Sequence, residues 1–241
     1  MSLNSILNKP TFINGIGEVH PIQLKNWDEF ESYATVLVQS ESHFKTNGDY
    51  PLLDILVKGV GDELIIVALE RIFQLSLKND DVKFTSYVAG DYEFIVDDEN
   101  SITPDNYPIL RETIMRQNIL FEPKVYKNPA MQKWAEKVLQ TRSKNAPNVT
   151  LEDMLSTVSV MAGKHYWELA DYTMYQLKYD FNRICKINEY QTHSLLYANP
   201  HVDMSKVKIE HFAEKVEMYT NPYDGIFKEK SAFKNMNNAL Q

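Results

Sequence analysis

The chain has one cysteine among its 241 residues, Cys185. A single cysteine forms no disulfide within the chain, which excludes a disulfide-stapled fold and is typical of a reducing compartment. Cys185 follows Ile184 at the edge of an apolar stripe, and no second cysteine or cysteine–histidine signature accompanies it. We therefore predict a buried cysteine and not a reactive one.

Long hydrophobic runs are also missing. The longest, Leu64 to Leu69, is far shorter than the ~20 residues that a membrane span requires. Met1 to Pro10 contains no continuous apolar run of the kind found in signal peptides. We therefore expect no membrane partner and a protein that stays in the cytoplasm of the cell that makes it.

The chain has fewer basic than acidic residues. It contains 25 Lys and Arg and 33 Asp and Glu, which gives a net charge of −8. The cations are scattered among the anions along the whole chain. A nucleic-acid binder needs clustered cations to displace counterions from phosphates, so we expect no nucleic-acid partner.

The usual signatures of catalysis and cofactor binding are absent as well. The closest glycine pairs, Gly15–Gly17 and Gly59–Gly61, lack the third glycine or the Lys-Ser that a phosphate loop requires. None of the six histidines lies in an HExxH pattern. We predict no catalytic, cofactor-binding or metal-binding residue and no cofactor. One enzymatic alternative stays open, an active site assembled around His193, His201 and Asp203.

Aromatic residues are abundant, with 14 Tyr, 11 Phe and 3 Trp. The segment from Tyr166 to Tyr190 predicts one long helix, since apolar residues recur along it at steps of three and four. This stripe consists of Trp167, Ala170, Met174, Leu177, Phe181 and Ile184. Tyr172, Tyr175 and Tyr179 form a second row, so the apolar face is too wide for a lone surface helix. Either other helices cover it or a partner does. On the second interpretation, the partner-binding residues are Tyr172, Tyr175, Tyr179 and Phe181.

The first hundred residues mix strands and helices. Asn14-Gly15 and Ala89-Gly90-Asp91 interrupt runs of β-forming residues, which predicts hairpins near 11–24 and 82–96. Asn26 and Glu29 stand at capping-box spacing before one helix, and Asp62 begins a longer one. We interpret 97–104 as a linker to the remainder of the chain.

Beyond this linker the pattern is helical. Helices are predicted to begin at Pro129, which suits a first helical position, and at Thr150 with Asp153 as its capping partner. Gly163 ends the second of these. A final helix is predicted to carry Ile209, Phe212, Val216 and Tyr219 and to stop at Asn221-Pro222. The predicted fold is α+β and predominantly α. Residues 1–100 form an α+β part, 101–227 an all-helical bundle and 228–241 a flexible tail.

Several short stretches of the chain together suggest a known group of proteins. They are Asn106-Tyr107, Leu110-Arg111, Gln117-Asn118, Leu151-Glu152-Asp153-Met154, Tyr175-Gln176-Leu177 with Phe181 and Arg183-Ile184, Asn221-Pro222-Tyr223-Asp224, and at the start Phe12 to Gly17 with Pro21-Ile22. These stretches resemble proteins encoded in the tail-gene region of tailed bacteriophages of Gram-positive hosts. The resemblance covers roughly residues 100 to 225 and, more weakly, the first 40.

The resemblance implies a tail-assembly chaperone or a baseplate or tail component that acts by binding and not by catalysis. It implies a phage tail partner, such as a tape-measure or baseplate protein, and self-association is a further option. The protein would then work in the host cytoplasm during assembly, with retention in the virion left open. A host-directed phage effector is the alternative within the same setting.

Overall fold

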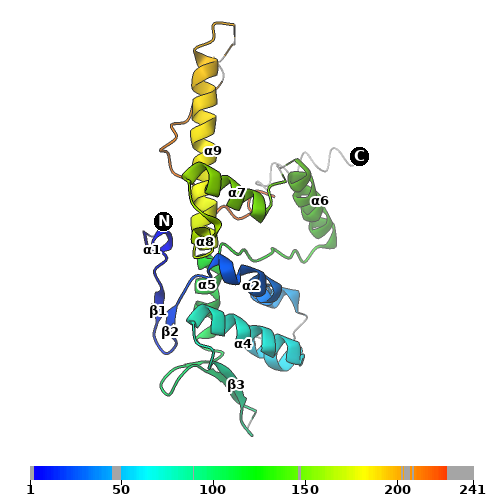
Figure 1. The fold of residues 1–241 in the computed structure, drawn as a ribbon. Helices are drawn as coiled ribbons and strands as arrows, with labels where there is room; N and C mark the ends of the chain where they lie inside the picture. The colour runs from blue at the N-terminus through cyan, green and yellow to red at the C-terminus, as the bar shows by residue number, and fades with distance from the viewer. Residues whose placement is uncertain are drawn as a thin grey trace.

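Helices dominate the chain, and two small antiparallel sheets lie in its first half (Figure 1). The computed structural model describes residues 3–44, 50–88, 90–145, 148–201, 203, 207 and 209–226, with the backbone alone at 145. The elements in chain order are α1 (Leu3–Ile6), β1 (Thr11–Ile13), β2 (Gly17–Val19), η1 (Leu24–Asn26), α2 (Trp27–Ala34), η2 (Glu41–His43), α3 (Leu52–Asp54), η3 (Ile55–Gly59), α4 (Glu63–Leu77), β3 (Lys83–Ser86), β4 (Tyr92–Ile95), β5 (Ser101–Ile102), α5 (Tyr107–Gln117), α6 (Pro129–Asn145), α7 (Leu151–Ala162), α8 (Tyr166–Leu169) and α9 (Met174–Tyr197). The predicted α+β, predominantly α class is confirmed.

Both predicted hairpins form. β1 pairs with β2 around a turn in which Gly15 has a φ of 77°, a conformation that suits glycine. β3 pairs with β4, and β4 also pairs with β5, so a third strand lies inside the predicted linker. The linker prediction missed this strand because Asp97 turns the chain back. Its carboxylate accepts hydrogen bonds from the N–H groups of Glu99 and Asn100, both at 2.9 Å.

The helix starts of the first half are set by different means. Asp62 caps α4 as predicted, since its carboxylate accepts from the N–H of Leu64 at 2.9 Å. The capping box predicted at Asn26 is wrong. The 3₁₀ turn η1 leads directly into α2, and the Asn26 side chain makes no capping hydrogen bond. Before α4 the chain forms η3, a π-helical segment that ends at Gly59.

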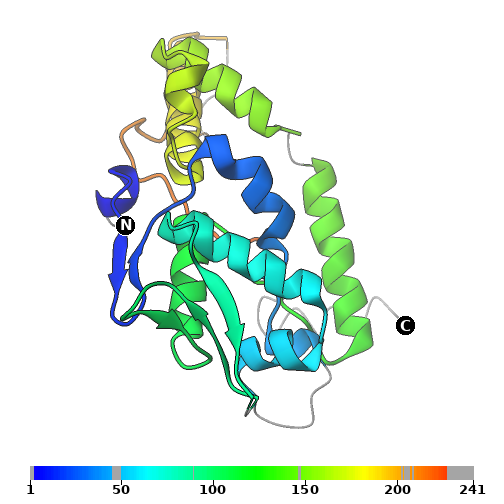
Figure 2. The ribbon, with the colours of Figure 1, turned by 60° about the horizontal axis from the view of Figure 1, so that its bottom comes forward.

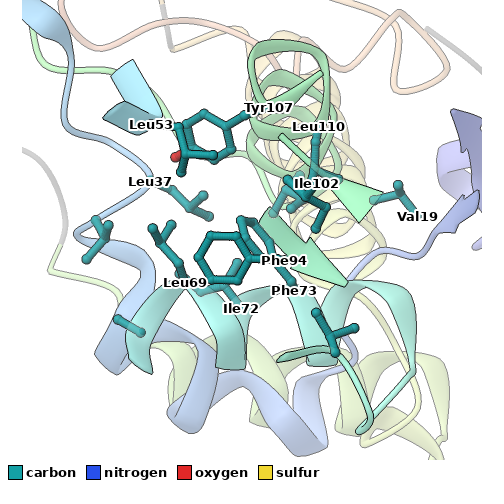
Figure 3. Packing of buried hydrophobic residues seen from close by; sticks show 14 of the residues in the cluster. Val19, Leu37, Leu53, Leu69, Ile72, Phe73, Phe94, Ile102, Tyr107 and Leu110 are labelled. Atoms are coloured by element: carbon teal, nitrogen blue, oxygen red, sulfur yellow. The ribbon is translucent and has the colours of Figure 1, made fainter. Parts of the chain in front are cut away.

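A single apolar core joins α2, α4, the second sheet and α5 (Figure 3). Phe73 of α4 lies at its centre, 5.0 Å from the ring of Phe94 in an edge-on contact and 6.2 Å from the ring of Tyr107. Such aromatic pairs add about 0.5–1.5 kcal/mol to the free energy gained by burial alone. Leu37 and Leu69 close the opposite side of the cluster.

This core extends past the predicted linker. Ile102 of β5 and Tyr107 and Leu110 of α5 are fully buried in it. The division between residues 1–100 and 101–227 stays a prediction, with α5 packed against elements from both sides of residue 100. The predicted tail, 228–241, lies outside the described residues.

The helix predicted around Ile209 to Tyr219 is wrong. The described residues from 209 to 226, which we name the return segment, contain turns and irregular backbone but no helix. Val216 and Met218 are buried on either side of an exposed Glu217, which is the alternation of an extended chain. Figures 1 and 2 show this segment, in orange, lying beside α9. No helix in the described part of the chain has the length and apolar character needed to cross a membrane.

Candidate protein-binding surface around helices α7, α8 and α9

Helix α7 has well-defined ends, both predicted from the sequence. The N–H of Asp153 donates to the hydroxyl of Thr150 at 3.2 Å, and the N–H of Thr150 donates back to the Asp153 carboxylate at 3.0 Å. The hydrogen bonds that the backbone N–H and the hydroxyl of Thr150 donate to the Asp153 carboxylate lower the pKa of this carboxyl, the one from the backbone most strongly. Gly163 ends the helix with a φ of 65°, which glycine adopts without strain.

The long helix predicted from Tyr166 to Tyr190 is in fact two helices, because the chain breaks at 170–173. Thr173 caps α9 by accepting from the N–H of Gln176 at 3.2 Å. The carbonyls of Ala170 and Tyr172 are taken by the backbone N–H groups of Lys25 and Leu24 at 2.9 and 2.7 Å. The Thr173–Gln176 capping box was a local signal that the sequence analysis did not use. The two backbone hydrogen bonds from Leu24 and Lys25 therefore attach the junction of α8 and α9 to the N-terminal part.

The four predicted partner-binding residues are divided between two sides of α9. Tyr172 and Phe181 pack with α7 around Val158, Leu169 and Leu177. Tyr175 and Tyr179 pack on the other side with Ile119, Val216, Met218 and Tyr219. Tyr175 is 1% exposed, and the other three are half-buried. The structure therefore uses these aromatic rings to hold α9 to its own neighbours, and their role in partner binding stays a prediction.

The return segment is held along α9 by cations of that helix. Arg183 donates to the carbonyls of Phe212 and Glu214, the latter at 2.9 Å. Lys186 forms an ion pair with Glu210 at 3.2 Å. Outside α9, Lys124 forms an ion pair with Asp224 of the return segment at 2.8 Å. The segment therefore covers the Tyr175 side of α9 over most of the length of the helix.

A polar cluster locks the turn between α7 and α8 onto α9. The ammonium of Lys164 donates to the hydroxyl of Tyr172 and lies 4.6 Å from the centre of its ring. The same hydroxyl bonds to the carboxyl of Asp180, whose pKa is raised because burial disfavours its charge. The hydrogen bond that Lys164 donates to Tyr172 raises the pKa of Lys164. The cluster is a structural clip, and each of its members has a partner within it.

Four large apolar side chains beside this clip face solvent instead. They are Val160, Met161, Tyr166 and Trp167, which we name the exposed corner; Val160 is 75% exposed and Trp167 72%. The Trp167 ring stacks on His165, with the ring centres 6.0 Å apart. The sequence analysis placed Trp167 in the buried stripe, and that is wrong because the break at 170–173 turns α8 out of line with α9.

Two other sequence predictions concern the far half of α9. Cys185 is exposed and not buried, because it lies one residue, or ~100° of helix rotation, past the packed Ile184. His193 is half-buried on α9, and His201 and Asp203 are exposed beyond it. Within the described residues, no three His, Cys, Asp or Glu side chains are grouped so that they could hold a metal ion.

Comparison with known proteins matches this same part of the chain. The family described as "YomV second domain" matches residues 142–217, from the end of α6 through α9 into the return segment. Over 114 residues the chain is 28% identical to the "SPbeta prophage-derived uncharacterized protein YomV" of Bacillus subtilis (strain 168), covering 47% of this chain. The match covers 46% of that relative, so the chain spans about half its length. No solved structure matches. The similarities point to a phage-derived protein and do not concern the tail in particular.

Proposed function

We propose that the protein is a non-enzymatic phage tail-assembly protein, a chaperone or a baseplate or tail component, that binds its partner through the exposed corner. The observation that carries the proposal is the solvent exposure of Val160, Met161, Tyr166 and Trp167. These four residues lie in one eight-residue stretch inside the matched region. Soluble proteins rarely leave large apolar side chains together in water without a binding role. Tryptophan, tyrosine and methionine are also the types enriched at protein interfaces.

The corner is presented on a rigid base, which favours binding. The capping box at Thr150, the Gly163 turn and the Lys164–Tyr172 clip fix both helices that carry it. A pre-ordered surface loses less conformational entropy when a partner docks than a mobile one does. By contrast, a partner could reach Tyr175 only if the return segment moved away.

The proposed partner is a phage tail protein such as a tape-measure or baseplate protein, met in the host cytoplasm during assembly. The prophage origin of the relative and the resemblance of the tail-region stretches support this setting. Self-association through the corner and binding of a host protein by a phage effector are the alternative outcomes of the same test.

The test is an affinity pull-down of the tagged protein from phage-producing cells, followed by mass spectrometry. We expect a tail protein in near-stoichiometric amount with the wild type, and its loss with the double variant M161E/W167D. Both side chains are exposed, so this variant should keep its stability to within about 0.5 kcal/mol per site. The matched control is V67E, which changes an exposed valine of α4, outside the matched region.

Two outcomes would count against the proposal. Recovery of the same tail protein by M161E/W167D would show that the partner binds elsewhere on the chain and not at the exposed corner. Recovery of host proteins alone would favour the effector alternative. The variants Tyr175→Asp and Phe181→Asp are less informative, because both side chains pack inside the chain and their loss would destabilise it.

A further inference from the structure

A small cavity lies where the N-terminal segment, α5 and the return segment meet. Its volume is about 170 Å³, whereas one water needs only ~10–15 Å³ measured in the same way. It is lined by Asn4, Ser5, Lys9, Thr11, Pro21, Thr113, Arg116, Gln117 and Tyr219. The lining contains two cations and no carboxylate, although the chain carries a net charge of −8.

The two cations of the cavity are not neutralised by nearby acids. Within the described part of the chain, neither Lys9 nor Arg116 forms an ion pair, and Arg116 lies 5.9 Å from the ring centre of Tyr219. Ammonium and guanidinium groups that converge on one cavity favour an anion there. Three carbonyls near the end of α5 already have donors. Asn118 donates to the carbonyls of Ile114 and Arg116, and Leu120 donates to that of Met115.

Hydroxyl groups add neutral donors to the cationic ones. The Thr11 hydroxyl oxygen accepts from the side-chain amide of Gln117 at 3.2 Å, which leaves its proton free to donate. The hydroxyl of Thr113 is already used, because it donates to the carbonyl of Ile109 at 2.8 Å. An oxyanion in the cavity would thus meet Lys9, Arg116 and Thr11 as donors.

Gln117 forms part of the cavity wall, and its side-chain amide is held by hydrogen bonds within the chain. Its Nε2 donates to the carbonyl of Val19 at 2.9 Å, which fixes the orientation of the amide. Its Oε1 is buried and accepts no hydrogen bond from any described residue. Because this oxygen is closed to solvent, a ligand in the cavity does not reach it, and Gln117 serves to position the Thr11 hydroxyl.

We propose that this cavity binds a phosphate-type oxyanion, either free inorganic phosphate or the phosphate end of a small organic molecule. Its negative charge lies against Lys9 and Arg116, and the Thr11 hydroxyl donates to it. Because Tyr219 belongs to the return segment, the bound anion ties that segment to the N-terminal part.

Isothermal titration calorimetry of the full chain with sodium phosphate, at constant ionic strength, tests the site. We expect saturable binding to the wild type and a loss of about ten- to a hundredfold in affinity for K9Q/R116Q, since charge-assisted hydrogen bonds are removed. K133Q is the control, because it removes one exposed cation of α6 outside the cavity. Equal affinity of K9Q/R116Q and wild type, or no saturable binding, would overturn the proposal.

Two further titrants sharpen the result. Sulfate has the size of phosphate and should bind with similar affinity, because Lys9, Arg116 and Thr11 can donate to either oxyanion; saturable binding of phosphate without any binding of sulfate would overturn this account of the site. Adenosine 5′-monophosphate distinguishes the source of the anion. Tighter binding than inorganic phosphate would identify an organic phosphate as the occupant, and weaker binding would identify the free ion.

Discussion

At the scale of single residues, Asp180 is the group whose charge is most tied to the packing of α9. It is half-buried on this helix, and the ammonium of Lys164 acts on its charge from within the same polar cluster. Burial raises the pKa of Asp180 above its ordinary value of 3.8, which outweighs the opposite effects of Lys164 and Tyr172. The ionised carboxylate is therefore less stable in the folded chain than in the unfolded one.

This sets the sign of a pH effect. Between the two pKa values the folded state holds more of the Asp180 proton than the unfolded state does, so stability rises as the pH falls through this window. We expect the difference in free energy of unfolding, wild type minus D180N, to increase as the pH is lowered from neutrality toward 3.8. Urea titrations at several pH values measure it, with D98N as the control for loss of one exposed charge. A difference that falls with falling pH would contradict the assignment.

Some residues that act through local hydrogen bonds could be predicted from the sequence, although the cap predicted at Asn26 is wrong. Residues placed by distant contacts could not be predicted. Thr150, Asp153 and Gly163 do what their spacing indicates, since a capping box and a glycine end need no other part of the chain. Trp167 and Cys185 were misplaced. The exposure of Trp167 depends on the helix break at 170–173, which is fixed by Leu24 and Lys25 from the far end of the sequence, whereas that of Cys185 follows from its place one residue past the packed Ile184.

At the scale of elements, the return segment shows how spacing can mislead. Ile209, Phe212, Val216 and Tyr219 recur at helical intervals, and the segment nonetheless has no helix among its described residues. The alternation of buried Val216 and Met218 with exposed Lys215 and Glu217 was present in the sequence as a period-two pattern. That pattern is too short to distinguish an extended chain from a helix. The contacts of the segment with α9 make the difference, and these are not visible in the sequence.

The hold of this segment on α9 is testable with M218A. Met218 is buried against Tyr175 and Ile119, so its truncation should cost about 2 kcal/mol, at the lower end of the range for buried methionine. We expect the segment to loosen first, which limited trypsin digestion would report as faster cleavage after Lys215. M161A, which truncates an exposed methionine, is the matched control. Unchanged cleavage after Lys215 in M218A would mean that the polar contacts of Arg183 and Lys186 hold the segment alone.

At the scale of the whole molecule, exposed apolar side chains occur in both the N-terminal part, for example at Phe12 and Leu64, and the matched region. The first core buries Phe30, Phe73, Phe94 and Tyr107 completely. The α7–α9 region leaves the exposed corner in water, and Leu195 and Tyr197 at the end of α9 are exposed as well. In Figure 1 this end of α9 extends beyond the other helices. The fold class and most helix positions were predictable from periodicity, but the surface left free for a partner was not, because it follows from which faces the chain itself covers.

The most direct test of the proposed binding surface is site-specific photo-crosslinking in phage-producing cells. The change Trp167→p-benzoylphenylalanine puts a photoreactive ring in the exposed corner, and the same replacement of Val67 on α4 is the control. We expect irradiation to join the Trp167-substituted chain, and not the control, to a phage tail protein. Crosslinks from both positions alike, or from neither while the tail protein still co-purifies, would contradict binding through the exposed corner.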